Sequence, residues 1–243
     1  MGKLDGKVAI VTGGGSGIGK GIARAFADEG CAVVIAGRNA ERLHAAAEEL
    51  RRSGPPILAM PTDVTDEAQV KSLFERTMAQ FGRLDILVNS SGAFDGGPIE
   101  EISLEAWNRV IGANLSGPFL CIREAFKIMK KAGGGRIINI GSISAQRTRT
   151  NMSPYTASKF GIWGLTQAAA LEGRAHGIAV SCLHPGNIAV ERRTTSGREM
   201  DQEPMIPTEE LARVALLMAT LPPEANMLEA IVLPVTQLYL GRG

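Results

Sequence analysis

Short apolar runs alternate with amphipathic stretches along the whole chain. Runs rich in Val and Ile, without polar alternation, are typical of strands buried on both faces of a parallel sheet. Between them, apolar residues recur at helical spacing. The pattern predicts strands at 7–12, 31–37, 56–60, 84–89, 136–141, 178–184 and 228–234, and helices at 17–29, 40–53, 66–81, 105–131, 155–175 and 208–221.

This alternation of strand and helix favours an α/β fold. We expect a single domain spanning 1–243, built as a doubly wound parallel sheet of about seven strands with helices on both faces. In such a fold, ligands bind at the carboxyl ends of the strands, near the point where the strand order reverses. The polar stretch 185–207 lacks periodicity, and we interpret 186–207 as a substrate lid, with a linker as the alternative.

The composition argues against several classes of partner and location but does not identify the function. The 26 Lys and Arg residues nearly balance 25 Asp and Glu, which disfavours nucleic acid as a partner. The longest uncharged stretch, 175–190, is too short and too polar to span a membrane, and no secretory signal is visible, so we expect a cytoplasmic location. Cys31, Cys121 and Cys182 lie in apolar runs and predict buried free thiols. Neither cysteines nor histidines show metal-ligand spacing, so no metal is expected.

Glycine is concentrated in one place. Of 29 glycines, six fall within 13–21, directly after the first predicted strand. These glycines do not fit the register G-x-G-x-x-G, and a phosphate-loop NTPase would need Ser or Thr where Gly21 stands. The remaining nucleotide-binding pattern is T-G-x-x-x-G-x-G at Thr12–Gly19. Backbone without side chains, followed by a helix N-terminus, favours the binding of a pyrophosphate group there. A flexible tight turn is the alternative.

This spacing resembles the short-chain dehydrogenase/reductase family, a Rossmann-like fold that uses a nicotinamide cofactor. Asp63-Val64 and Pro185-Gly186 match two further motifs of the family, and Asn89–Gly92 reads N-S-S-G where the family has N-N-A-G. The resemblance implies cofactor contacts from Thr12, Gly13, Gly15, Ser16, Gly17, Ile18, Gly19, Arg38, Asp63, Val64, Asn89, Ser90, Gly92, Tyr155, Lys159, Pro185, Gly186 and Ile188.

Asn114, Ser142, Tyr155 and Lys159 fall at the places of the family's catalytic tetrad. Tyr155 and Lys159 are four residues apart, so on a helix they share one face, and the ammonium can stabilise the phenolate. The resemblance implies that Tyr155 protonates a carbonyl oxygen as hydride arrives, and that Ser142 hydrogen-bonds the same oxygen. It also implies that Lys159 binds the nicotinamide ribose and that Asn114 holds a water relaying protons to Lys159. The alternative, a non-catalytic NADP-binding sensor or scaffold, predicts a damaged tetrad.

The end of the second predicted strand indicates the cofactor. An NAD enzyme of this type needs a carboxylate there to bind the ribose 2′-hydroxyl. Gly37 and Arg38 occupy this position, and a guanidinium binds a 2′-phosphate well. We therefore expect NADP, with NAD as a second option, although Ser16 replaces a basic residue often present in NADP-using relatives. A solvated turn residue is the alternative for Arg38.

The substrate is less defined. The C-terminal stretch 221–237 is similar to family members acting on serine and other 3-hydroxy acids, which suggests a 3-oxoacyl or 3-hydroxy-acid substrate. Val190 stands where the family usually has Thr. Family habit implies a homodimer or homotetramer formed by helices 105–131 and 155–175. Arg147, Arg149, Arg192 and Arg193 are either carboxylate ligands of the substrate or ordinary surface arginines.

Overall fold

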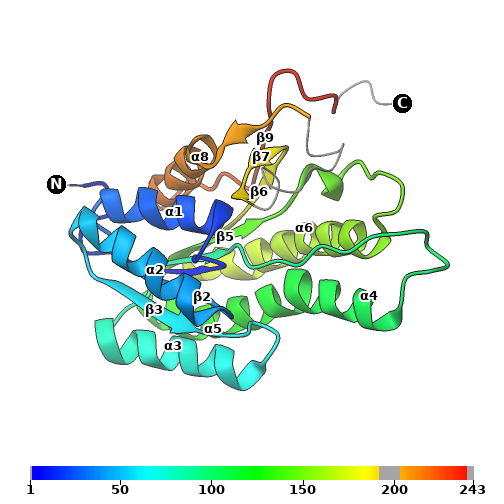
Figure 1. Ribbon diagram of the computed structural model, residues 1–243. Helices are drawn as coiled ribbons and strands as arrows, with labels where there is room; N and C mark the ends of the chain where they lie inside the picture. The colour runs from blue at the N-terminus through cyan, green and yellow to red at the C-terminus, as the bar shows by residue number, and fades with distance from the viewer. Residues whose placement is uncertain (1, 192–202, 240–243) are drawn as a thin grey trace.

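The apolar runs assemble into one parallel sheet in the computed structural model, which describes residues 2–191 and 203–239 (Figure 1). Its seven strands follow the order β3-β2-β1-β4-β5-β6-β9. The order reverses between β1 and β4, so the predicted doubly wound topology is confirmed. The strands are β1 (Val8–Thr12), β2 (Ala32–Gly37), β3 (Ile57–Pro61), β4 (Ile86–Asn89), β5 (Gly135–Ile140), β6 (Ile178–Pro185) and β9 (Glu229–Val232).

Helices cover both faces of the sheet, as Figure 1 shows. Alternate strand residues point to opposite faces: Val33 and Ile35 join the core beneath one set of helices, whereas Val34 joins the other. Both faces of the central strands are therefore apolar. One face carries α1 (Gly17–Asp28), α2 (Ala40–Leu50) and α8 (Thr208–Thr220), and the other α3 (Glu67–Phe81), α4 (Leu104–Ile111), α5 (Gly117–Ala132) and α6 (Ser153–Gly173).

Local sequence signals set several helix ends. The side chains of Asn39, Asp66 and Ser103 accept hydrogen bonds from the first-turn amides of α2, α3 and α4. At the opposite ends of α3 and α5, Gly82 and Gly133 adopt φ of 70° and 79°. Glycine adopts this left-handed conformation at no steric cost, which ends the helix.

Two features differ from the sequence prediction. The single helix expected at 105–131 is divided by a π-helical turn, Gly112–Ser116, between α4 and α5. The stretch 186–207, expected to be a lid, begins and ends with two short paired strands, β7 (Ile188–Ala189) and β8 (Ile206–Pro207). Strands of two residues are too short for hydrophobic periodicity to reveal. Residues 192–202 of that lid, including Arg192 and Arg193, lie outside the described residues.

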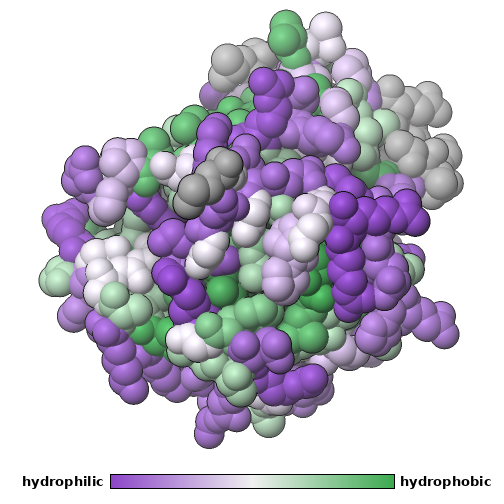
Figure 2. All heavy atoms as spheres, turned by 90° about the vertical axis from the view of Figure 1, so that its left-hand side faces the viewer, coloured by the Kyte–Doolittle hydropathy of each residue, from purple (hydrophilic) through white to green (hydrophobic). Residues whose placement is uncertain are grey.

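The surface fits the balanced composition. Figure 2 shows a face on which hydrophilic residues surround smaller groups of hydrophobic ones. Among the described residues, no helix is long and apolar enough to cross a membrane. The predicted free thiols are present, because Cys31, Cys121 and Cys182 are buried and unpaired with one another.

Candidate active site

A cleft of about 1640 Å³ opens at the carboxyl edge of the sheet, where the strand order reverses. Drug-sized ligands occupy roughly 300–1000 Å³, so this cleft has room for a larger ligand or for two ligands together. Of the residues expected at the site, it is lined by Gly13, Gly15, Ser16, Gly17, Ile18, Gly19, Arg38, Asp63, Val64, Ser90, Gly92, Asn114, Tyr155, Lys159 and Pro185.

The glycine-rich turn forms one wall of the cleft. Gly13 and Gly17 adopt φ of 68° and 51°, which other residues adopt only with strain. At Gly19 a Cβ atom would lie 2.4 Å from the carbonyl oxygen of Gly13. The turn is therefore packed backbone against backbone, and only glycine permits this approach.

The helix that follows this turn offers free donors to an anion. Ser16 precedes α1, but its side chain makes no capping hydrogen bond, unlike the residues that precede α2, α3 and α4. No acidic residue stands in the first turn of α1. The first amides of α1 and the positive end of its dipole thus face the cleft, which suits a phosphate or pyrophosphate.

Replacing Gly19 with Ala is expected to destabilise the fold, although Ala normally favours a helix over Gly. The new methyl group meets main-chain atoms of Gly13 that cannot rotate away, and overpacking of this kind costs about 1–3 kcal/mol. Gly15→Ala is the matched control in the same turn, because its methyl would meet only side-chain atoms, Leu43 at 3.3 Å and Arg42 at 3.6 Å. Urea unfolding of both variants checks this, and equal stability of the two contradicts it.

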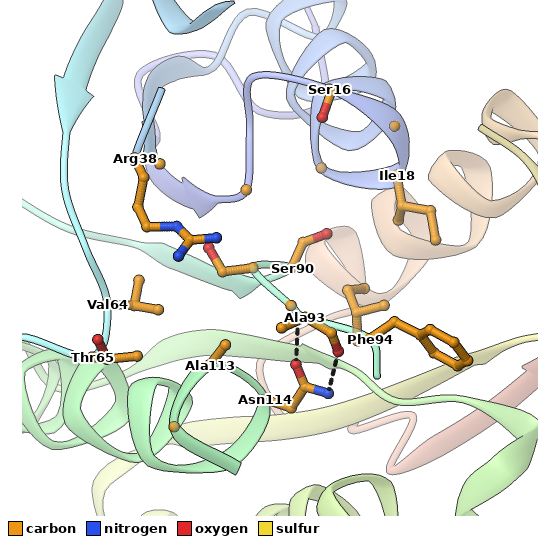
Figure 3. Close-up of a pocket in the computed structure, with 18 of the residues that line it drawn as sticks. Ser16, Ile18, Arg38, Val64, Thr65, Ser90, Ala93, Phe94, Ala113 and Asn114 are labelled. Atoms are coloured by element: carbon orange, nitrogen blue, oxygen red, sulfur yellow. Dashed lines mark hydrogen bonds between the residues drawn. The ribbon is translucent and has the colours of Figure 1, made fainter. Parts of the chain in front are cut away.

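Arg38 extends into one end of the cleft, opposite Phe94 at the other end (Figure 3). Arg38 follows β2 directly, and Asn39 and Arg42 line the same end. Sequence reasoning missed Arg42, although its position one turn into the following helix was a usable signal. With two guanidinium groups and no carboxylate from 37 to 39, this end of the cleft favours a phosphate group.

Two predicted contacts support the cleft from beneath without lining it. The hydroxyl of Thr12 accepts hydrogen bonds of 3.1 Å from the amides of both Ser90 and Ser91, which holds the turn after β4 against β1. Asn89 is buried and donates to Asn139 at 2.8 Å. Neither side chain lines the cleft. The structure therefore gives Thr12 and Asn89 a positioning role.

Tyr155 and Lys159 lie side by side on α6, as their spacing predicted. The ammonium of Lys159 is 5.5 Å from the centre of the Tyr155 ring and donates to the carbonyl oxygen of Ile140 at 2.8 Å. Lys159 is buried, yet both residues line the cleft. The ring of Phe94 tilts against Tyr155 with 5.2 Å between ring centres. Phe94, which sequence reasoning missed, encloses the phenol on the side of the β4 turn.

Both amide protons of Asn114 and one lone pair of its amide oxygen are engaged by neighbouring groups. Its Oδ1 accepts from the amide of Ala93 at 2.7 Å, and its Nδ2 donates to the carbonyl of Ala93 at 3.0 Å (Figure 3). The same Nδ2 donates to Ser158 at 3.0 Å. Asn114 lies in the π-helical turn, a widened geometry frequent at functional sites. Its side chain joins the β4 turn to α6, and a water bound here can use main-chain atoms or the second lone pair of Oδ1.

Ser142 lies at the end of β5, one residue beyond Gly141, which lines the cleft. Its hydroxyl accepts from the amide of Ser144 at 3.1 Å, and the side chain is buried beside the cleft wall. Gly186 and Ile188 lie behind the wall, beyond Pro185. Gly186 leaves no room for a Cβ atom, which would lie 2.3 Å from Oε1 of Gln237.

Arg147 and Arg149, the described arginines suggested as ligands of a substrate carboxylate, contact other side chains of this protein. Arg149 forms an ion pair with Glu203 at 3.0 Å, and Arg147 lies 5.8 Å from the centre of the Tyr239 ring. Neither lines the cleft, so their interpretation as carboxylate ligands is not supported.

Val190, which stands where the family usually has Thr, lines the cleft beside Gly17. Burial raises the pKa of the Cys182 thiol to about 12, which keeps this neighbour of Lys159 protonated.

Comparison with known proteins agrees with this geometry. The family model "short chain dehydrogenase" matches residues 7–201. The chain belongs to the short-chain dehydrogenase/reductase family. It is 37% identical to D-threitol dehydrogenase of Mycolicibacterium smegmatis over 90% of this chain and 87% of that protein. It is 44% identical to cis-4-hydroxycyclohexanecarboxylate dehydrogenase of Sinomonas cyclohexanicum, over 74% of this chain and 72% of the relative.

A solved family member extends the similarity to three dimensions. A metagenomic short-chain oxidoreductase in complex with NADP superposes with a TM-score of 0.85 and 32% identity, covering 97% of this chain and 100% of the other. Membership in this family makes the protein an NAD(P)-dependent oxidoreductase that acts on alcohol or carbonyl groups of small molecules.

Proposed function

We propose that this short-chain dehydrogenase/reductase transfers hydride between NADP and a carbonyl or secondary alcohol. The observation that carries the proposal is the placement of its chemistry along one cleft. Arg38 and Arg42 stand at one end, the uncapped start of α1 in the middle, and Tyr155 with Lys159 at the other. A dinucleotide with an added 2′-phosphate matches this order of groups.

The residues present fit NADP, which supplies the hydride when bound. The amides of α1 and the glycine turn would hold the pyrophosphate, because the glycines leave this backbone bare and the side chain of Ser16 does not cap the first turn of α1. Arg38 and Arg42 would bind the 2′-phosphate, and Asp63 with Val64 would border the adenine. The ammonium of Lys159 has three N–H donors. It would donate to the ribose hydroxyls either after breaking its hydrogen bond to the carbonyl of Ile140 or while keeping that bond.

The proton path is proposed from this chain's own residues. Tyr155 would donate its phenolic proton to the carbonyl oxygen of the substrate, and Ser142 would donate a hydrogen bond to the same oxygen. The ammonium of Lys159, held beside the phenol ring, stabilises the phenolate that remains. Asn114 would hold a relay water through main-chain atoms of the π-helical turn or through the second lone pair of its Oδ1, because both protons of its side-chain amide are already donated.

A 3-oxoacyl or 3-hydroxy-acid substrate remains the prediction from the C-terminal resemblance. The cleft wall near Tyr155 carries Phe94, and the adjacent Ala93 also lines the cleft, which favours an apolar group next to the reacting carbon. The relatives named above act on a polyol and on a ring hydroxy acid, so both neutral and acidic substrates enter the test.

A panel of carbonyl compounds tests the proposal. We expect oxidation of NADPH in the presence of at least one ketone, and slower oxidation of NADH at equal concentration. Matched pairs that differ only by a carboxylate, such as a 3-oxoester and its 3-oxoacid, resolve the substrate class. Turnover with neither cofactor, alongside tight NADPH binding, would instead support the non-catalytic sensor.

The assembly and location expected from the sequence stay predictions. Phe119, Phe160 and Leu171 are exposed apolar residues on α5 and α6, the helices expected to form a dimer or tetramer. Such residues are typical of an interface between subunits. The buried free thiols agree with the cytoplasm, which keeps thiols reduced.

A further inference from the structure

His184 is a buried titratable residue that the mechanism above does not use. It lies near the end of β6, and its side chain is completely buried against the β5 end. Its Nδ1 atom is 2.9 Å from the carbonyl oxygen of Ser142 and 3.2 Å from the amide nitrogen of the same residue. A Cβ atom at Gly141 would lie 2.5 Å from Nδ1, so the ring rests directly on this main chain.

The other ring nitrogen faces the last strand. His184 Nε2 lies 3.4 Å from Oε1 of Glu229 and has no hydrogen-bond partner among the described residues. The amide of Gln146 donates to the same carboxylate oxygen, and Tyr239 donates to the amide oxygen of Gln146. A polar chain therefore connects the C-terminal segment to the main chain of Ser142 through the imidazole.

The groups around the ring decide its charge. Burial lowers the pKa of His184, and the Lys159 ammonium from α6 acts in the same direction. The carbonyl of Ser142 and the carboxylate of Glu229 oppose this without reversing it. Trp163 of α6 meets the ring edge-on at 5.7 Å and carries no charge, and the thiol of Cys182 stays protonated. The ring is therefore neutral near pH 7 and holds its proton on one nitrogen.

The two neutral tautomers are not equivalent here. With the proton on Nε2, the ring points a donor at Glu229, and Nδ1 accepts from the amide of Ser142. With the proton on Nδ1, the ring donates to the carbonyl of Ser142 but presents a lone pair to the carboxylate of Glu229. Each arrangement leaves one unfavourable contact: the first sets the Nδ1 lone pair 2.9 Å from the Ser142 carbonyl oxygen, and the second sets the Nε2 lone pair 3.4 Å from the Glu229 carboxylate. The carboxylate carries a full negative charge and the carbonyl oxygen only a partial one, so the second contact is the more repulsive in a buried setting.

We propose that His184 is a positioning residue for Ser142, and that Glu229 keeps the ring proton on Nε2 so that Nδ1 binds the Ser142 amide. The ring then holds the main chain of Ser142, whose hydroxyl is the proposed hydrogen-bond donor to the substrate carbonyl, although the ring itself does not line the cleft. The catalytic consequence of this arrangement rests on the function proposed above, whereas the tautomer does not.

Nitrogen-15 NMR of the imidazoles tests the tautomer without turnover. The signals of His184 are assigned by their loss in His184→Asn. We expect the Nε2-protonated form in the native chain, and a shift toward the Nδ1-protonated form in Glu229→Gln, because a neutral amide can donate to Nε2. The Ser142 amide signal should move in the same variant. A native ring protonated on Nδ1, or a tautomer unchanged in Glu229→Gln, overturns the proposal even if the protein reduces ketones.

Kinetics with two replacements of His184 test the positioning. In His184→Asn the amide oxygen can still accept from Ser142, whereas His184→Phe keeps the ring and loses the acceptor. We expect kcat to fall about tenfold further in the Phe variant than in the Asn variant, the value of one hydrogen bond, with similar NADPH dissociation constants. Equal kcat in the two variants overturns the proposal. So does a loss of NADPH binding that matches the loss of kcat, since that indicates general damage.

Discussion

Replacing Tyr155 with Phe is expected to lower kcat about a thousandfold while NADPH remains bound, the range that general acid–base catalysis contributes. The change removes only the phenolic oxygen, so the ring still packs against Phe94 at 5.2 Å and beside the Lys159 ammonium. Single-turnover oxidation of NADPH with the best ketone of the panel measures the loss.

Two controls accompany the Tyr155→Phe measurement. The dissociation constant for NADPH and the melting temperature should both stay close to those of the native enzyme, because the cleft keeps its shape. Unchanged turnover would remove Tyr155 from the mechanism and direct attention to Ser142 or to a water as proton donor. If the native protein binds NADPH but turns over no ketone, there is no kcat to compare with the variant, and the non-catalytic sensor is favoured.

Replacing Arg38 with Asp is expected to weaken NADPH binding about 10–100-fold and to leave NADH binding much less affected. Under the proposed function, the substitution would delete a charge-assisted hydrogen bond to the 2′-phosphate and add a repulsive carboxylate at the end of β2, where an NAD enzyme carries an acid. The ratio of kcat/KM for the two cofactors, measured at one ionic strength, reports the effect.

Arg76→Asp is the matched control for Arg38→Asp. Arg76 is exposed on α3 and does not line the cleft, so the same change of charge there should leave the cofactor ratio unaltered. Equal losses for NADPH and NADH in Arg38→Asp would mean that Arg38 supports the turn rather than recognising the phosphate, and Arg42 would become the main candidate.

The sheet could be predicted from the sequence because its signal is local. Each central strand is apolar on both sides, and Gly82 and Gly133 mark helix ends where the chain needs a left-handed residue. The π-helical turn at Gly112–Ser116 could not be predicted, because the contact of Asn114 with Ala93 joins residues 21 positions apart. Tertiary contact, and not helix propensity, decides the geometry there.

The candidate site likewise contains residues that could be predicted from the sequence and residues that could not. The order and spacing of Asn114, Ser142, Tyr155 and Lys159 were sufficient to place these residues around one edge of the sheet. The residues that brace them were not recognisable, because they come from distant segments: His184 meets Ser142 across 42 positions, and Tyr239 meets Gln146 across 93. A histidine before a proline and a tyrosine near the C-terminus carry no signal of such contacts.

The close approach of Gly141 to His184 has an evolutionary consequence. The imidazole occupies the space that a side chain at 141 would need, since a Cβ there would lie 2.5 Å from one ring atom and 2.7 Å from another. The two positions therefore cannot vary independently. A relative that gains a side chain at the place of Gly141 should have lost the ring at the place of His184, and its catalytic serine must then be held by other means.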